Sequence, residues 1–343
     1  MRLLTVLMLI PVLLGLHSPA MAATEAGATQ RLRWTNDAFV GTDNQFSNGV
    51  AWQQFSAHRS TLEATSGTPA FGKRLVRPLL PHHQGLTYRE GWALAHKIQT
   101  PDEIKRPDLN LDDVPYLGMA AWSNSFFAFD DRNFAGFEWL IGWVGKATQA
   151  QPLQRMAHRT TGARRPRGWS NQLDNEPIFN LYYARKHKFL QMDGFDAAVS
   201  FDAALGTYFT YGQAGIEMRF GRTPGGFAYA ATPVGKGLQY DATLRRDGET
   251  YAYFSLVPAV THLLHAMPRD GNVLRRDNAW TQQNRVRPER TIGRLIIGAH
   301  YERPRWGAHL NLWFGTDSVD PRTVVDRLDT ANNFGAFTLE RRL

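Results

Sequence analysis

The stretch GFDAAVSFDAALG, residues 194–206, alternates apolar and polar or small side chains with a period of two. One face carries Phe195, Ala197, Val199, Phe201, Ala203 and Leu205, and the other carries Asp196, Ser200, Asp202 and Gly206. Because successive side chains of a β-strand point to opposite faces of its sheet, this pattern predicts a strand with one apolar face and one polar face.

The same alternation recurs along most of the chain, in segments of roughly ten residues or more with many aromatic side chains. We place about twelve strands, the number and length typical of an outer-membrane β-barrel. The placements are 29–38, 46–57, 86–99, 116–129, 133–146, 176–190, 194–206, 208–221, 249–264, 291–303, 305–316 and 332–343. A soluble β-sandwich or lipocalin-like protein also alternates in this way and stays open as an alternative, although strand length and aromatic content favour the membrane barrel.

The first 22 residues have the pattern of a secretory signal peptide. Arg2 is followed by an apolar run and by the small-x-small sequence Ala20-Met21-Ala22, so residues 23–343 are predicted to form the mature barrel. The chain contains no cysteine, which excludes disulfide scaffolds and thiol chemistry, and after residue 22 it has no apolar run long enough for a membrane helix. We therefore expect a protein of the bacterial outer membrane; its net charge of +8 is scattered, and no nucleic-acid-binding module is recognisable.

Connection lengths predict which end of the barrel faces outward. The tight turns at 130–133 and 193–194 are expected on the periplasmic side, where barrels place their short turns. The long connections 100–115, 147–175, 265–290 and 317–331 then face the outside. Two further long connections, 58–85 and 222–248, fall on the periplasmic side, and they are either plugs or a sign that the strand count is wrong there.

Two polar clusters stand out at the outer end. The first is TNDAFVGTDNQFSNG, residues 35–49, in which Asn36 and Asp37 are neighbours on one predicted strand and should face opposite sides. The second is the connection that contains Gln154 and His158. These residues are four apart on a helix predicted over Ala150 to Arg159, and Gly162 is the residue expected to stop it. Non-functional explanations stay open for several of these residues. Asp and Asn side chains satisfy turn amides, which accounts for Thr42, Asp43 and Asn44. A histidine in a surface loop often has no function, and Arg164, Arg165 and Arg167 could form a solvated basic surface.

Taken together and in order, the two clusters resemble the outer-membrane lipid A 3-O-deacylase family. The resemblance is carried by ND-x4-TD-x3-[ST]-x-G and by Q-x3-HR-x2-G followed by GW-x2-QL, which here are Asn36, Asp37, Thr42, Asp43, Ser47, Gly49, Gln154, His158, Arg159, Gly162, Gly168, Trp169, Gln172 and Leu173. The family also implies a twelve-stranded barrel, which the alternation predicts independently.

The resemblance implies a calcium-dependent (Ca2+) hydrolysis of the 3'-linked acyl ester of lipid A, the membrane anchor of lipopolysaccharide. Under it, His158 is the general base, Asn36, Asp37 and Ser47 surround the reacting group, and Asp37 is a calcium ligand. Gln154 is expected to position the water, the imidazole or the metal. Direct attack by water is preferred to a covalent Ser47 intermediate, because no nucleophile-elbow sequence surrounds Ser47.

Lys105 and Arg106, in the outer connection 100–115, are candidates for binding the lipid A phosphates through charge-assisted hydrogen bonds. The alternative that both are solvated loop residues without a function stays open. The protein is expected to act as a monomer. Two other functions stay open: a barrel without catalysis, such as a pore or an adhesin, and an outer-membrane phospholipase or esterase.

Overall fold

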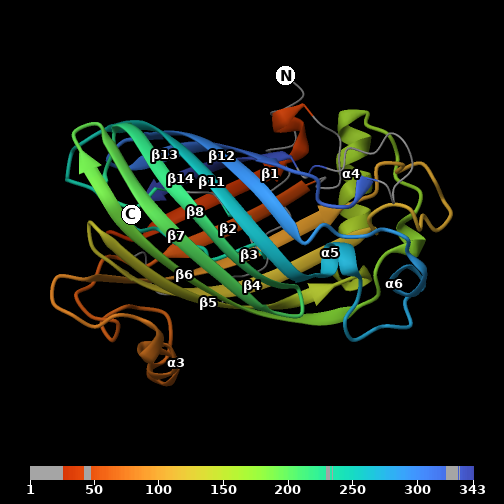
Figure 1. Ribbon diagram of the computed structural model, residues 1–343, viewed down its shortest axis with the longest axis horizontal. Coiled ribbons are helices and arrows are strands. Elements are labelled where there is room, and N and C mark those ends of the chain that lie inside the picture. Colours follow the sequence, from red (N-terminus) through yellow and green to blue (C-terminus); the bar gives the residue numbers. More distant parts are fainter. Residues whose placement is uncertain (1–25, 42–47, 229–231, 234, 322–330, 332) are drawn as a thin grey trace.

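The computed structural model describes residues 26–41, 48–228, 232–233, 235–321, 331 and 333–343. The expected signal peptide and Thr42, Asp43, Asn44 and Ser47 lie outside the described residues. Within the described residues, twelve antiparallel strands close into one barrel, in the order β1-β14-β13-β12-β11-β8-β7-β6-β5-β4-β3-β2 (Figure 1). The predicted fold class, an all-β barrel with a short helix in an outer connection, is confirmed.

The strands lie within two residues of their predicted ends. Their bounds are β1 Thr29–Asn36, β2 Asn48–Phe55, β3 Thr87–Gln99, β4 Leu117–Phe129, β5 Asn133–Val144, β6 Glu176–Met192, β7 Phe195–Gly206, β8 Phe209–Arg222, β11 Tyr251–Ala266, β12 Thr291–Glu302, β13 Trp306–Gly315 and β14 Phe334–Arg342. The first and last strands pair along their whole length, from Thr29 opposite Arg342 to Asn36 opposite Gly335. This pairing leaves the sheet without an edge, as a bilayer requires.

The alternation corresponds to the two faces of the barrel wall. On β7, Phe201 and Leu205 are exposed on the outer face, whereas Asp196 and Ser200 are buried on the inner face. Other strands repeat the arrangement, with outward Ile141, Trp143, Phe254 and Leu264. An outward apolar surface of this kind suits lipid chains, while inward charged groups such as Asp196 and Arg219 form ion pairs inside the lumen.

Short turns gather at one end of the barrel, called here the turn end, and most of the helices, among them α4, α5 and α6, at the other, called the loop end (Figure 1). At the turn end, Asp130 Oδ1 accepts the backbone N–H groups of Arg132 and Asn133, and Gly194 adopts a φ of 72° between β6 and β7. The loop-end helices are η1 Asp37–Val40, η3 Lys146–Thr148, α4 Ala150–Thr161, η4 Trp169–Asn171, α5 Met267–Asp270 and α6 Ala279–Gln283. No helix in the described part of the chain is both long and apolar enough to span a bilayer.

The connection between β8 and β11 enters the lumen as a plug, residues 223–250, with the two short strands β9 Gly225–Gly226 and β10 Thr243–Leu244. Its Asp241 carboxylate binds Arg31 of β1 at 3.0 Å and Arg89 of β3 at 2.6 Å, and all three side chains are buried. The backbone N–H of Gln239 donates to Glu138 of β5, and the Lys186 ammonium of β6 donates to the Tyr240 hydroxyl at 2.6 Å. The plug interpretation of 222–248 is thus correct, and the strand count is right.

For 58–85 the plug interpretation is wrong. This segment, with α3 Ala70–Val76 and η2 Arg77–Leu79, packs on the outer face of the wall near the turn end (Figure 1). Thr65 and Thr68 donate to the Glu90 carboxylate, which faces outward from β3. An outward carboxylate would be costly against lipid chains, and the segment covers it.

Candidate functional site

The first polar cluster lies where β1 ends at the loop end. Asn36 follows the outward residues Leu32 and Trp34, and its side-chain oxygen accepts the backbone N–H of Ala38 at 2.9 Å, which caps η1. The strand ends there, so Asp37 is not on the strand as the range 29–38 predicted; it begins η1 and is buried, with 6% of its surface exposed. The expectation that the two side chains face opposite sides of one strand is therefore wrong, because Asn36 turns the chain into the short helix.

Packing on both sides holds this end of β1 in place. Phe39 of η1 contacts Trp34 with ring centroids 4.8 Å apart and lies over Gly335 of β14, where a Cβ atom would come within 2.4 Å of Phe39. The Trp34 indole donates to Asn48 of β2 at 2.8 Å. Contacts with β14 on one side and β2 on the other thus fix the end of β1, where the candidate metal ligands Asn36 and Asp37 lie.

The second cluster is the helix α4, which confirms the predicted helix and its end at Gly162, where φ is 73°. His158 is half-buried, and its ring Nδ1 contacts the backbone carbonyl of Arg164. Since a carbonyl oxygen only accepts, Nδ1 carries the proton in this contact. In the neutral ring with this tautomer, Nε2 is the nitrogen that can accept a proton.

Gln154, one turn before His158, is buried and contacts the GW-x2-QL segment. Its side-chain oxygen accepts the Trp169 indole N–H at 2.8 Å, and Gln172 in turn donates to the backbone carbonyl of Trp169 at 3.0 Å. Trp169 packs against Tyr116 with centroids 4.9 Å apart. The motif residues that are separate in sequence therefore form one hub, defined by Gln154, Trp169, Gln172 and Tyr116, that fixes the helix carrying His158.

The helix lies on the outer face of β3 and β4. Ala150 packs with Ile98, Tyr116 and Trp169. Gly118 makes the close approach possible, because a Cβ atom there would lie 2.2 Å from Thr148 Oγ1 and 2.5 Å from Ala150 Cβ. Outward His96 contacts the carbonyl of Thr148 at 2.9 Å.

Strand order relates the two clusters. β1, β2, β3 and β4 are consecutive in the barrel, and neighbouring strands lie about 4.8 Å apart. The end of β1 and the seat of α4 on β3 and β4 are thus separated by roughly 10–15 Å along the rim. Figure 1 shows η1 and α4 at the same end of the barrel.

Lys105 and Arg106 are exposed in the connection that packs beside this hub. The Arg167 backbone N–H donates to Ile104 at 2.7 Å, and the Tyr116 hydroxyl donates to the same carbonyl at 2.9 Å. Arg164, Arg165 and Arg167 are also exposed at the loop end. The fold therefore brings both basic groups to the side of the barrel that carries α4.

Asp113 anchors the connection 100–115 from beneath. Its carboxylate accepts the backbone N–H groups of Asp102 at 2.8 Å and Val114 at 2.6 Å, and its backbone carbonyl accepts the Trp280 indole at 3.0 Å. Burial raises the pKa of Asp113 to about 6, against the opposing effect of the two backbone N–H groups.

A sequence model described as outer membrane protein LpxR matches residues 7–343. The chain belongs to the LpxR family of outer membrane proteins. Among solved structures, LpxR from Salmonella typhimurium is similar, with a TM-score of 0.70 and 14% identity over 92% of this chain and 100% of that one, which shows a shared fold. The β domain of the Bordetella autotransporter Brka has a TM-score of 0.42 and 9% identity over 92% of this chain and 98% of that one. A comparison with curated proteins finds no match.

Calcium is the metal that the resemblance to the family implied. Asn36 and Asp37 offer amide and carboxylate oxygens, the hard donors that calcium prefers. Within the described residues, no group of three or more His, Asp or Glu side chains gathers as a metal site. Calcium takes about six to eight oxygen ligands, so the donors at the end of β1 fit the ion in type and would supply only part of its shell.

Sequence analysis did not predict that α4 packs on the outer face of β3 and β4. His96 interrupts the outward apolar series between Leu94 and Ile98, and Gly118 stands where β4 should present an outward side chain. Both departures from the alternation were visible signals that something covers the wall at this point.

Proposed function

We propose that this LpxR-family barrel hydrolyses the 3'-linked acyl ester of lipid A in the outer leaflet, with calcium as cofactor. The observation that supports this most is the position of α4. The helix carries His158 with its Nδ1 against a backbone carbonyl, so that Nε2 can accept a proton, and it lies on the outer face of β3 and β4 rather than in the lumen. A lipid in the outer leaflet reaches such a site directly from the bilayer.

In the proposed reaction, His158 Nε2 removes a proton from water as the water oxygen attacks the ester carbonyl carbon. The tetrahedral intermediate then breaks the bond to the sugar oxygen, which takes the proton back from His158. The products are a fatty acid and a free sugar hydroxyl. Gln154 acts through the Trp169 contact, by fixing the helix turn from which His158 projects.

Asn36 and Asp37 would hold calcium near the ester, with Asp37 supplying the charged oxygen, and Ser47 would complete the polar surroundings. A bound calcium ion would supply Lewis-acid polarisation of the ester carbonyl. Lys105 and Arg106 would bind the lipid phosphates at the surface beside the hub. The proposed enzyme works as a monomer.

The lumen gives no support to a pore. The plug places Asp241 and Tyr240 among wall side chains, and Asp241, Arg31 and Glu340 are each at most 3% exposed. Charged groups packed in this way close the passage at their level.

The experiment is mass spectrometry of lipids after incubation with the detergent-extracted, folded protein. Purified lipopolysaccharide and glycerophospholipid vesicles are each tested with calcium and with a chelator. We expect loss of a 3'-acyl group from lipid A with calcium only, and intact phospholipids. Hydrolysis of the phospholipids alone would replace lipid A deacylation with the phospholipase alternative, and no hydrolysis of either lipid would contradict an esterase.

A further inference from the structure

Large apolar side chains are exposed on the segment 58–85, which packs on the outer wall near the turn end. Phe71 and Leu75 of α3 are 70% and 68% exposed, and Leu79 of η2 is 40% exposed. They follow one another at intervals of four residues, so they share one side, called here the α3 face. Their exposure is similar to that of Phe201, which is 59% exposed on the outer face of β7. An exposed apolar surface of this kind marks a contact with lipid or with another protein.

The opposite side of the segment is attached to the barrel. Val76 and Leu80 are buried in one cluster with outward residues of β3, β4 and β5, among them Tyr88, Phe126 and Phe137. Figure 1 shows α3 outside the wall on this side of the barrel. The α3 face therefore points away from the wall, toward the medium that surrounds the barrel there.

The height of the attachment places the segment beside the bilayer. The Thr68 hydroxyl donates to the side-chain oxygen of Asn124 on β4 at 3.1 Å. Asn124 is six residues from the tight turn at Asp130, and a tilted strand of that length rises roughly 15 Å along the barrel axis. The apolar band of a membrane barrel is about 25 Å tall. The segment thus covers part of the wall that would otherwise face lipid.

The segment also satisfies its own polar groups on the side of the wall. Lys73 is buried, and its ammonium donates to the backbone carbonyls of Glu63, at 3.3 Å, and of Thr65. Thr65 and Thr68 in turn donate to the Glu90 carboxylate. Backbone and charged groups beside lipid need partners of this kind. The contacts suit a segment that lies within the membrane interface.

Cations accompany the exposed apolar residues. The charged residues of the segment 58–85 are Arg59, Lys73, Arg74 and Arg77, with Glu63 as the one carboxylate. Arg74 is exposed beside Leu75 and makes no hydrogen bond or ion pair with any of the described residues. Arg77 binds Glu63 at 3.8 Å, and 62% of each side chain is exposed. Arginine stems lie along apolar surfaces and carry their charge to the level of lipid headgroups.

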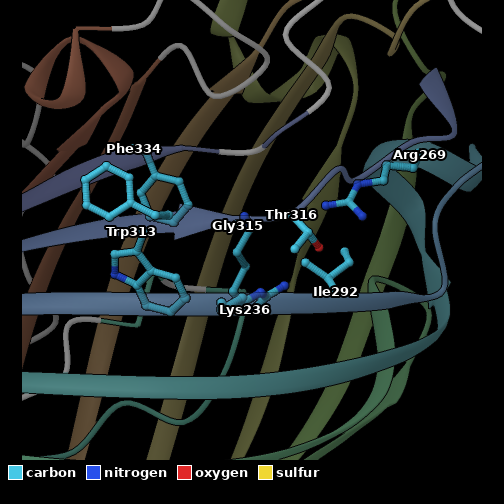
Figure 2. Close-up of a pocket in the computed structure, with 9 residues that line it drawn as sticks. Lys236, Arg269, Ile292, Trp313, Gly315, Thr316 and Phe334 are labelled. Carbon is cyan, nitrogen blue, oxygen red and sulfur yellow. The ribbon is translucent and has the colours of Figure 1, made fainter.

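The lumen at the loop end offers no comparable surface. Lys236, Arg269 and Trp313 face one another across a space with room for about one water molecule (Figure 2). A larger ligand has no place among these side chains. Lipid, in contrast, reaches the α3 face directly from the bilayer.

We propose that the α3 face binds glycerophospholipid in the periplasmic leaflet of the outer membrane. Phe71, Leu75 and Leu79 insert among the acyl chains, and Arg74 and Arg77 bind the phosphates of anionic headgroups. The surface continues the apolar outer face of the barrel, and it lies toward the turn end, which barrels direct to the periplasm. The proposal does not rest on the deacylation, since α4 and His158 are at the loop end.

Site-directed labelling tests the proposal, because the chain contains no cysteine and a single introduced one carries the only label. Leu75→Cys carries a polarity-sensitive fluorophore on the α3 face. Asp247→Cys, at an exposed residue of the plug, is the water-facing control, and Phe201→Cys is the lipid-facing reference. Each full chain is folded into vesicles of phosphatidylethanolamine and phosphatidylglycerol that contain a spin-labelled phospholipid as quencher. We expect quenching at residues 75 and 201 and none at residue 247.

The contribution of the arginines is tested with two quenchers that differ only in their headgroup. At residue 75 and low salt, spin-labelled phosphatidylglycerol should quench roughly twofold more strongly than spin-labelled phosphatidylcholine. Arg74→Gln combined with Arg77→Gln should abolish this difference. The control Arg246→Gln, which removes an exposed guanidinium from the plug, should retain it. Heat-dependent mobility on a gel shows that each variant is folded.

Three results would overturn the proposal. A fluorophore at residue 75 that behaves like the one at residue 247 would place the α3 face in water. A fluorophore shielded from the lipid quencher and from a water-soluble one, with energy transfer between labelled copies, would mean that a second copy of the chain covers the face. Equal quenching by the two headgroups in the presence of both arginines would contradict the binding of anionic phosphates.

Discussion

The lumen near the turn end and the α4 hub on the outer wall hold their polar groups for different reasons. In the lumen, Arg31, Arg89 and Asp241 are joined by charge pairs whose members are all buried. At the hub, one neutral hydrogen bond between Trp169 and Gln154 fixes a helix, and His158 stays half-buried. The comparison indicates that the charges of the lumen are paired within the protein, whereas the hub positions a helix whose His158, the proposed base, stays partly accessible.

Breaking the lumenal network should give the largest change in stability. Asp241→Asn removes the carboxylate that faces Arg31 and Arg89, and an uncompensated buried charge costs about 3–5 kcal/mol. We expect that loss in the free energy of unfolding, measured by urea titration in detergent, with hydrolysis per folded molecule unchanged. Asp247→Asn, at an exposed carboxylate of the same plug, is the control and should leave both quantities unchanged.

The hub should respond in the opposite way. Trp169→Phe replaces the indole with a smaller aromatic ring that has no N–H, and it leaves the Gln154 oxygen buried without its donor, at a cost of about 1–3 kcal/mol. Since that cost falls on the attachment of α4, we expect the rate of hydrolysis to fall about tenfold while the unfolding midpoint of the barrel stays unchanged. If the variant instead loses barrel stability and keeps its full rate of hydrolysis, the hub has a structural role only.

A glycine pair sharpens the comparison further. Gly118→Ala would place a Cβ atom within 2.5 Å of Thr148 and Ala150, so α4 must shift. Gly212→Ala meets no atom within 4 Å on an exposed part of β8 and serves as the matched control. We expect a several-fold loss of activity in the first variant only, measured on lipid A at saturating calcium.

The smallest effect concerns pH. The pKa of Asp113 is about 6 in the folded protein and its ordinary value is 3.8, so the folded state binds the proton more tightly. Its contribution to the stability of the connection 100–115 is therefore greatest below pH 4, and it is lost as pH rises through 6. Hydrogen exchange of this connection, corrected for intrinsic rates, should show faster opening at pH 7 than at pH 4.5. Asp113→Asn should lose this difference, and an unchanged pH dependence in the variant would contradict the assignment.

The strands could be predicted from sequence because period-two alternation is local and is imposed by lipid on one side of every strand. The end of β1 was less predictable, because Asn36 caps η1 through its own side chain and stops the strand before Asp37. The course of 58–85 along the outer wall depends on outward Glu90, which the alternation does not explain by itself.

Individual elements of the candidate site could be predicted from sequence, but the contacts between them could not. The helix from Ala150 and its end at Gly162 follow from local rules, and the fold brings it to the end of the barrel at which β1 ends with Asn36 and η1 begins with Asp37. The bond between Gln154 and Trp169 joins residues 15 positions apart through a loop, and only tertiary structure determines it. The roles of His158, Asn36, Asp37, Ser47, Lys105 and Arg106 stay predictions.

The most direct test of the central claim compares two histidines at opposite ends of the barrel. His158 and His83 each have ring Nδ1 against a backbone carbonyl, but His83 is in the outer-wall segment near the turn end. Lipid A is analysed by mass spectrometry after incubation with His158→Ala, His83→Ala or the unmodified chain, each shown to be folded by its heat-dependent mobility on a gel. The account predicts at least a hundredfold loss of 3'-deacylation, on the order of the ~10²–10⁴ contribution of a general base, in His158→Ala alone. Full activity in folded His158→Ala would contradict it.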